Sequence, residues 1–210
     1  KSRLFSNLRI DNNMSQAVHQ TNLTNLPLVA RGKVRDIYQI DENHLLFVTT
    51  DRISAFDVVM PSPVPGKGEI LTRISNFWFK KSEGLIANHL TKLALSDFIP
   101  AAELKLLKDR SVIVKKLRPL PVEAIVRGYI IGSGWKDYQR NGAICGIDLP
   151  SGLQLADKLP QAIYTPSTKA AVGDHDINIS FNETIDLIGQ DLAEQVRDVS
   201  LTLYQMAADY

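Results

Sequence analysis

The run from Leu117 to Gly134 constrains the fold more than any other stretch of this chain. Its apolar residues predict a strand over Val122–Ile131, and the glycines and serine that follow predict a helix from about Ser133 to Arg140. Arg127 stands alone among apolar neighbours, where a charge is costly unless something pairs with it. A helix that opens on small residues offers its first N–H groups to an anion. The run indicates either a site for a phosphate-bearing small molecule or a surface strand with an exposed arginine and a plain turn.

Charge and composition argue against several classes of protein. The 210 residues carry 24 basic and 23 acidic side chains, so the basic stripe that non-specific nucleic-acid binding needs is missing. No apolar stretch is long enough to cross a bilayer, and Cys145 is the only cysteine, so we expect no disulfide framework. We therefore predict a cytoplasmic protein without nucleic-acid or membrane partners, and both a monomer and a homodimer stay open.

Residue periodicity predicts two domains with a boundary near Arg118-Pro119. We expect an upstream extension over residues 1–13, a sheet domain over 14–118 and a second domain over 119–210. A helix from Asn182 that stops in mid-pattern at Tyr210 suggests a further C-terminal part. The other expected elements are two strands within Leu28–Thr50 joined by a turn at Asp41–Asn43, helices over Glu69–Lys81 and Ala101–Lys108, strands over Ser111–Leu117 and Val122–Ile131, a helix end at Asn141-Gly142, a mostly loop segment over Ser151–Asp176, and an N-cap at Ser180 or Asn182.

Three polar clusters each allow a ligand-binding and a purely structural interpretation. In Gly32–Asp36, a glycine beside a lysine can cover a phosphate, or the segment is a β-turn with solvated charges. Asp51–Asp57 follows a strand end, where polar groups often line a cleft, or it satisfies its own backbone. Pro166–Lys169 and Asp174–Asp176 could neutralise a phosphate and receive a magnesium ion, or they cap the next helix.

Taken together, these stretches resemble the SAICAR synthetases, the phosphoribosylaminoimidazole-succinocarboxamide synthases of purine biosynthesis. Leu120–Ser133 matches that family's first signature, and Gly32–Tyr38, Asp51–Asp57 and Thr165–Lys169 match in the same order. The resemblance runs from about Leu26 to Tyr210 and is closest to the long form of the family. It implies an α+β fold: an N-terminal antiparallel sheet domain related to the kinase small lobe, and a second domain similar to ATP-grasp enzymes, with ATP between them.

The resemblance also implies an activity and its residues. The enzyme would be a magnesium-dependent ligase that uses ATP to join carboxyaminoimidazole ribotide (CAIR) to L-aspartate, giving SAICAR, ADP and phosphate through an acyl phosphate. ATP binding is assigned to Gly32, Lys33, Val34, Arg35, Val114, Lys115, Leu117 and Glu123. The ribotide phosphate is assigned to Arg127 and Ser133, the imidazole or aspartate side to Ser54 and Asp57, and the phosphate-transfer region to Lys169 and Asp176.

The family's second signature, of the form Asp-x-Lys-x-Glu-Phe-Gly, is absent from these residues. It supplies magnesium and ATP ligands in the family, so we expect the main metal ligands beyond Tyr210 and little activity from residues 1–210 alone. Two other functions stay open. One is a module that holds a phosphorylated nucleotide without catalysis. The other is a kinase-like phosphotransferase, against which the absence of His-Arg-Asp and Asp-Phe-Gly motifs counts.

Overall fold

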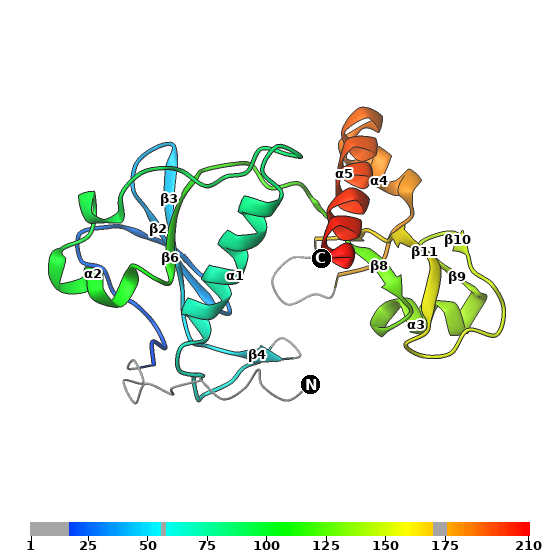
Figure 1. Ribbon diagram of the computed structural model, residues 1–210, viewed down its shortest axis with the longest axis horizontal. Helices are drawn as coiled ribbons and strands as arrows, with labels where there is room; N and C mark the ends of the chain where they lie inside the picture. The colour runs from blue at the N-terminus through cyan, green and yellow to red at the C-terminus, as the bar shows by residue number, and fades with distance from the viewer. Residues whose placement is uncertain (1–16, 56–57, 170–175) are drawn as a thin grey trace. The chain divides into compact units, whose positions relative to one another are not determined.

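The computed structural model describes residues 17–55, 58–169 and 176–210. These residues fall into two compact units, the first ending at Leu117 and the second beginning at Arg118 (Figure 1). The expected extension over residues 1–13 and the candidate residue Asp57 lie outside the described residues. Within the described ranges, no helix has the length and the apolar character that a membrane span requires.

A four-stranded antiparallel sheet organises the first unit. Alternation along β2 and β3 turns Tyr38, Leu46 and Val48 into a core with Leu107 and Ile113. The sheet has the order β1-β2-β3-β6 and is built from β1 (Leu28–Arg31), β2 (Arg35–Gln39), β3 (His44–Thr49) and β6 (Ser111–Lys115). The smaller elements of this unit are β4 (Ser54–Ala55), β5 (Val58–Val59), the 3-10 helix η1 (Leu95–Asp97) and α2 (Ala101–Leu107).

The first part of the sheet differs from the prediction of two strands. Residues 32–34 form a tight turn that splits the region into β1 and β2, and the Gly32 N–H donates to the Arg35 carbonyl at 2.8 Å. The predicted turn at Asp41–Asn43 is confirmed, because it joins β2 to β3. The chain therefore makes two successive hairpins, and the first has a glycine and a lysine at its tip.

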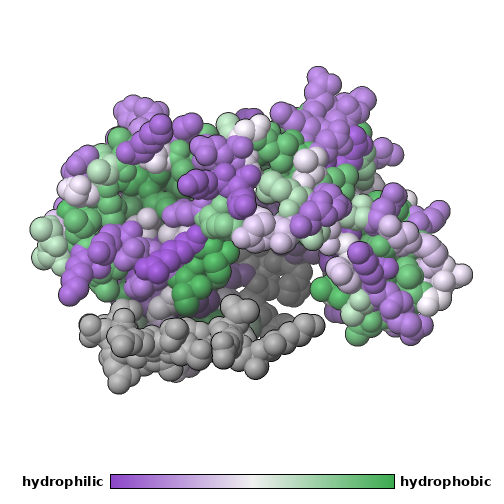
Figure 2. All heavy atoms as spheres, in the orientation of Figure 1, coloured by the Kyte–Doolittle hydropathy of each residue, from purple (hydrophilic) through white to green (hydrophobic). Residues whose placement is uncertain are grey.

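Helix α1 (Lys67–Lys81) begins two residues before the predicted start, and a side chain distant in sequence holds its first turn. Its N-cap, Gly66, has φ 76° and offers no side chain, so the Asp51 carboxylate accepts the Gly68 N–H at 2.8 Å instead. Gly68 must be a glycine, because a Cβ there would collide with the Thr49 carbonyl oxygen. Much of α1 is exposed, including Ile70 and Ile74, and Figure 2 shows hydrophobic side chains interspersed with hydrophilic ones on the visible face.

In its described residues, the second unit combines short strand pairs with three helices. Its core contains Ile130, Ile144, Leu159 and Ile163. Strand β8 pairs with β11, β7 with β12, and β9 with β10. The elements are β7 (Val122–Glu123), β8 (Val126–Tyr129), α3 (Gly132–Asn141), β9 (Ala143–Ile144), β10 (Ile147–Asp148), β11 (Lys158–Tyr164), β12 (Ser167–Thr168), α4 (Phe181–Ile188) and α5 (Gln190–Asp209).

Helix α5 packs on the β8–β11 pair and lies beside α4 (Figure 1). The contact is close, because a Cβ on Gly128 of β8 would collide with the Tyr204 hydroxyl of α5. A side chain at this position would displace the Tyr204 ring, so the packing of the last helix favours a glycine immediately after Arg127, independently of any ligand.

Two predictions for the second unit are wrong, and a third is incomplete. The strand expected over Val122–Ile131 is broken, because β7 and β8 pair with different partners. The segment expected to be mostly loop over Ser151–Asp176 also contains β11, where Pro160 is tolerated in a two-stranded pair with an irregular register. The single last helix is divided at Gly189, whose φ of 83° and ψ of 155° are not helical. The helix ending at Gly142 and the N-cap at Ser180 are confirmed.

Candidate functional site

The turn between β1 and β2 is held by hydrogen bonds to its carbonyl groups. Arg52 donates from Nη2 to the Gly32 carbonyl at 2.8 Å and from Nε to the Lys33 carbonyl at 3.0 Å. The Val34 carbonyl accepts from Thr50, through both N–H at 3.0 Å and Oγ1 at 2.9 Å. Three successive carbonyls are thus fixed by the segment that follows β3, while Gly32 and Lys33 remain exposed.

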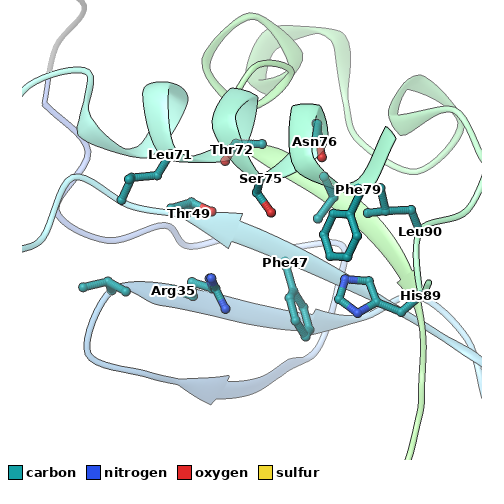
Figure 3. A pocket seen from close by; sticks show the side chains of 12 residues that line it. Arg35, Phe47, Thr49, Leu71, Thr72, Ser75, Asn76, Phe79, His89 and Leu90 are labelled. Atoms are coloured by element: carbon teal, nitrogen blue, oxygen red, sulfur yellow. The ribbon is translucent and has the colours of Figure 1, made fainter. Parts of the chain in front are cut away.

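A cavity of about 140 Å³ lies beside this turn, between α1 and one face of the sheet (Figure 3). Val34 and Arg35 line it, together with Phe47 of β3 and Phe79 of α1. The His89 ring lies 5.2 Å from the Phe79 ring and 6.2 Å from the Phe47 ring, between centroids. Burial, followed by the charge of Arg35, lowers the pKa of His89, so its ring is neutral at pH 7. An aromatic wall next to a cationic side chain suits a flat group that carries an anion.

The other candidates of the first unit lie on or near β6 and β4. Val114 is buried in β6. The N–H groups of Lys115 and Lys116 already donate to the carbonyls of His89 and Asn43, so this part of the strand has few amides to offer a ligand. Leu117, beyond the end of β6, is 63% exposed. Ser54 is half-buried in β4.

In the second unit, Arg127 and Ser133 lie in direct contact. Arg127 Nη2 donates to Ser133 Oγ at 2.9 Å, and its Nη1 makes only a long contact of 3.5 Å to the Ile131 carbonyl. The Arg127 Nε is buried and has no partner among the described residues. A Cβ on Gly134 would lie 3.1 Å from this nitrogen, so the guanidinium packs against the first turn of α3.

This arrangement is electrostatically incomplete. Helix α3 begins at Gly132 without a side-chain cap, so its first N–H groups and the positive end of its dipole adjoin the guanidinium. Among the described residues, Arg127 forms no salt bridge that would offset this charge. An anion placed between the guanidinium and the helix end would satisfy both.

Two polar residues that sequence reasoning missed support Ser133. Its hydroxyl donates to Asn178 Oδ1 at 3.4 Å, and Asn178 Nδ2 donates to Asp137 Oδ2 at 2.6 Å. Asp137 also pairs with the exposed Arg140 at 2.8 Å. The spacing of Ser133 and Asp137 on one helical face was the available signal, but nothing local indicated Asn178.

The remaining candidates of this unit meet on a small ladder of strands. Ser167 of β12 pairs with Glu123 of β7 on one side and with Asn178 on the other. The antiparallel register therefore brings Lys169 opposite Asp176, and both are exposed. Ser167 is 2% exposed, and its Oγ has no partner among the described residues. The ladder and the start of α3 are joined through Asn178.

Cys145 lies close to this cluster but is not a nucleophile. Burial raises the pKa of its thiol to about 11, against the opposing influence of the nearby Arg127. A thiol with that pKa is protonated at neutral pH, and the reactive species is the thiolate. The chemistry of this unit therefore depends on its charged and hydroxyl groups.

A profile of the protein family described as SAICAR synthetase matches residues 28–210. The chain belongs to the SAICAR synthetase family. A relative named phosphoribosylaminoimidazole-succinocarboxamide synthase, from Thioalkalivibrio sulfidiphilus (strain HL-EbGR7), is 60% identical over 198 residues. The matched part covers 94% of this chain and 67% of that relative. The family resemblance stated from the motifs is therefore confirmed.

Solved structures of SAICAR synthetases share this fold. SAICAR-synthase from Saccharomyces cerevisiae, in complex with SAICAR, matches with a TM-score of 0.84 and 44% identity over 92% of this chain and 66% of that one. A SAICAR synthetase in complex with ADP matches with a TM-score of 0.67 and 23% identity over 86% of this chain and 67% of that one. The predicted α+β class with an N-terminal antiparallel sheet is confirmed, and the chain spans about two thirds of the length of these relatives.

The described residues do not by themselves fit a magnesium site. Across the described ranges, no group of three or more His, Cys, Asp or Glu side chains is arranged to hold a metal ion. Of the two aspartates that the sequence suggested for magnesium, Asp174 lies outside the described residues.

Proposed function

We propose that this chain provides the nucleotide-binding and ribotide-binding parts of an ATP-dependent ligase that joins CAIR to L-aspartate. The observation that carries the proposal is the contact of Arg127 with Ser133 at the start of α3. A guanidinium with an unpartnered Nε, set against uncapped helix N–H groups, is suited to the phosphate of a ribotide. The Saccharomyces cerevisiae relative that was solved with SAICAR supports this substrate class.

ATP is proposed to bind at the first unit. Gly32 and Lys33 would cover its phosphates, and Val34 and Arg35 connect the turn to the cavity with the aromatic wall. Val114, Lys115 and Leu117 remain proposed ATP contacts, as does Glu123 of β7 in the second unit. The relative that binds ADP supports an adenine nucleotide as the ligand of this fold.

The proposed reaction requires activation of a carboxylate. The carboxylate of CAIR is a poor electrophile, so one of its oxygens would attack the terminal phosphorus of ATP, giving an acyl phosphate and ADP. The amine of L-aspartate would then attack the acyl carbon, lose a proton and expel phosphate. Such a reaction depends on positioning and on neutralising phosphate charge, which is the role proposed for Lys169 beside Asp176. Ser54 and Asp57 are proposed contacts on the imidazole or aspartate side.

The deciding experiment follows SAICAR and ADP formation by a protein of the family's full length that carries these residues. We expect both products to require ATP, CAIR and L-aspartate together. ATP binding without turnover would favour a nucleotide-binding module, and phosphorylation of a protein without any need for CAIR would favour a kinase-like enzyme. Either result contradicts the ligase.

Residues 1–210 alone are proposed to have little activity. The lack of a metal-binding cluster among the described residues supports this, because magnesium shields the phosphate oxygens in such reactions. The test compares phosphate release by residues 1–210 with release by the full-length protein, with CAIR and aspartate present. Comparable rates would contradict the proposal.

A further inference from the structure

The arginine behind the β1–β2 turn is buried and fully engaged. The Arg52 side chain is 4% exposed, and each of its three nitrogens has an acceptor. Besides the carbonyls of Gly32 and Lys33, these acceptors are the His19 carbonyl at 2.6 Å and the Asp36 carboxylate at 2.9 Å. Its charge is balanced by Asp36, so Arg52 has neither the exposure nor the spare charge to bind a ligand itself.

The hydrogen bonds from Arg52 fix the direction of two peptide groups. No peptide bond among the described residues is cis, and in a trans peptide the C=O and the N–H point in opposite directions. The carbonyls of Gly32 and Lys33 point toward the buried guanidinium. The N–H groups of the same two peptide units, which belong to Lys33 and Val34, therefore point away from it, on a turn whose tip is exposed.

Successive N–H groups that point the same way form a concave site for an anion. Such a site would collapse if the peptide units rotated, and a turn that contains glycine has little intrinsic resistance to rotation. Arg52 supplies that resistance from behind, through two charge-assisted hydrogen bonds to successive carbonyls.

We propose that Arg52 is a positioning residue for ATP: it holds the Lys33 and Val34 amides in the orientation that receives a phosphate group. This inference rests on the proposed function, in which the turn covers the ATP phosphates. Within the Asp51–Asp57 segment, Arg52 therefore acts on the backbone of the turn and does not contact the nucleotide itself.

The test uses Arg52→Lys in the full-length protein, because lysine keeps the positive charge beside Asp36 but cannot reach four acceptors with one ammonium group. Arg31→Lys and Arg110→Lys are matched controls. Arg31 also pairs with Asp36, and Arg110 is fully buried in a separate ion-pair network. Neither control residue bonds to the carbonyls of the turn. Thermal unfolding of all three variants shows whether they lose comparable stability.

We expect Arg52→Lys to raise the KM for ATP about tenfold or more, as the loss of a charge-assisted hydrogen bond implies, and to leave the KM for CAIR and aspartate within about twofold. The controls should leave the KM for ATP unchanged at a similar loss of stability. An unchanged KM for ATP in Arg52→Lys, or an equal rise in either control, would overturn the proposal.

A second measurement tests the same inference through ADP binding to the wild-type protein. It requires neither catalysis nor a variant that folds. Added ADP should shift the amide NMR signals of Lys33 and Val34 in the wild-type protein. Absence of those shifts under conditions where ADP binds would refute the positioning role even if the enzyme makes SAICAR. Amide shifts without SAICAR formation would instead refute the ligase and leave the inference standing.

Discussion

The β1–β2 turn of the first unit and the start of α3 in the second unit both combine small residues with an arginine, but they use the arginine in opposite ways. Arg52 lies behind its turn, and every nitrogen of its guanidinium has an acceptor. Arg127 lies in front of its helix, with one nitrogen unpartnered among the described residues and another held at 3.5 Å. The first arginine supports a backbone anion site, and the second forms part of one.

The comparison suggests a rule for interpreting an arginine near a predicted phosphate site. A guanidinium whose donors are all used contributes to the geometry of its neighbours, and its loss should appear first in stability. A guanidinium with unused, oriented donors should show its loss in ligand affinity. Substitutions in the two units can separate these two kinds of arginine.

The largest expected effect is on stability and concerns Arg110, a fully buried arginine that lies between two carboxylates. Its ion pairs to Asp51 at 3.0 Å and Glu69 at 2.8 Å are buried on the arginine side. Asp51→Ala should lower the free energy of unfolding by about 3–5 kcal/mol, because it removes the buried one of the two carboxylates that pair with Arg110 and the acceptor of the Val18 and Gly68 N–H groups. Urea unfolding measures this. Asp109→Ala is the control, since Asp109 forms an exposed pair with Arg73 at 3.8 Å and should cost less than about 1 kcal/mol. Similar losses in the two variants would contradict the prediction.

Arg127→Ala should act on affinity. In the full-length protein it should raise the KM for CAIR by about 10- to 100-fold, equivalent to roughly 1.5–3 kcal/mol for a hydrogen bond to a charged group. The unfolding free energy should change little, since Arg127 forms few strong bonds within the protein. Arg140→Ala removes an exposed arginine from the last turn of α3 and should leave the KM near that of the wild type. A folded Arg127→Ala variant with unaltered CAIR dependence would reject the phosphate role.

Lys33→Ala should weaken ATP use more modestly. Lys33 is exposed at the tip of the turn, and an exposed ionic contact is worth about 0.2–1 kcal/mol, which corresponds to at most about a fivefold rise in the KM for ATP. Steady-state kinetics at varied ATP measure this, with Lys67→Ala as a control from the start of α1. Normal ATP kinetics in Lys33→Ala would leave the backbone amides as the main phosphate ligands of the turn.

The smallest effect at neutral pH concerns the titration of Asp36. Burial favours its protonated form, but hydrogen bonds from Thr21 and Arg52 outweigh burial and hold the pKa of Asp36 below its ordinary value. A carboxylate with a lowered pKa adds stability above its unfolded pKa of about 3.9, and this contribution is lost as the pH falls through the folded pKa. Urea unfolding below about pH 4 should therefore be steeply pH-dependent in the wild type and less so in Asp36→Asn. Parallel pH profiles would contradict this.

The contact of Arg127 with Ser133 could be foreseen from the sequence better than the support of the β1–β2 turn. Arg127, Ser133 and the start of α3 are close along the chain, so one strand and one helix bring them together. In the first unit, the support of the turn comes from Arg52 and Thr50, which follow β3, and only the register of the hairpins places them behind residues 32–34. Asn178 was missed for the same reason, because the ladder with Ser167 brings it to α3.

The elements that were predicted wrongly also depended on distant partners. Strand β11 contains a proline and has no clean alternation, and it forms because β8 offers a backbone edge. The start of α1 depends on the Asp51 carboxylate, which no local capping pattern reveals. The break at Gly189 was visible in the sequence, since a glycine between two helical patterns often separates them.

The contact between Gly128 and Tyr204 sets a lower limit on how far the second unit can be shortened. The residue after Arg127 in β8 is Gly128, which has no side chain, and the Tyr204 ring of α5 packs against its backbone. A trimmed version for crystallography or ligand screening must therefore keep α5 at least through Tyr204. Protease digestion that removes α5 should abolish ribotide binding while every proposed contact residue is still present.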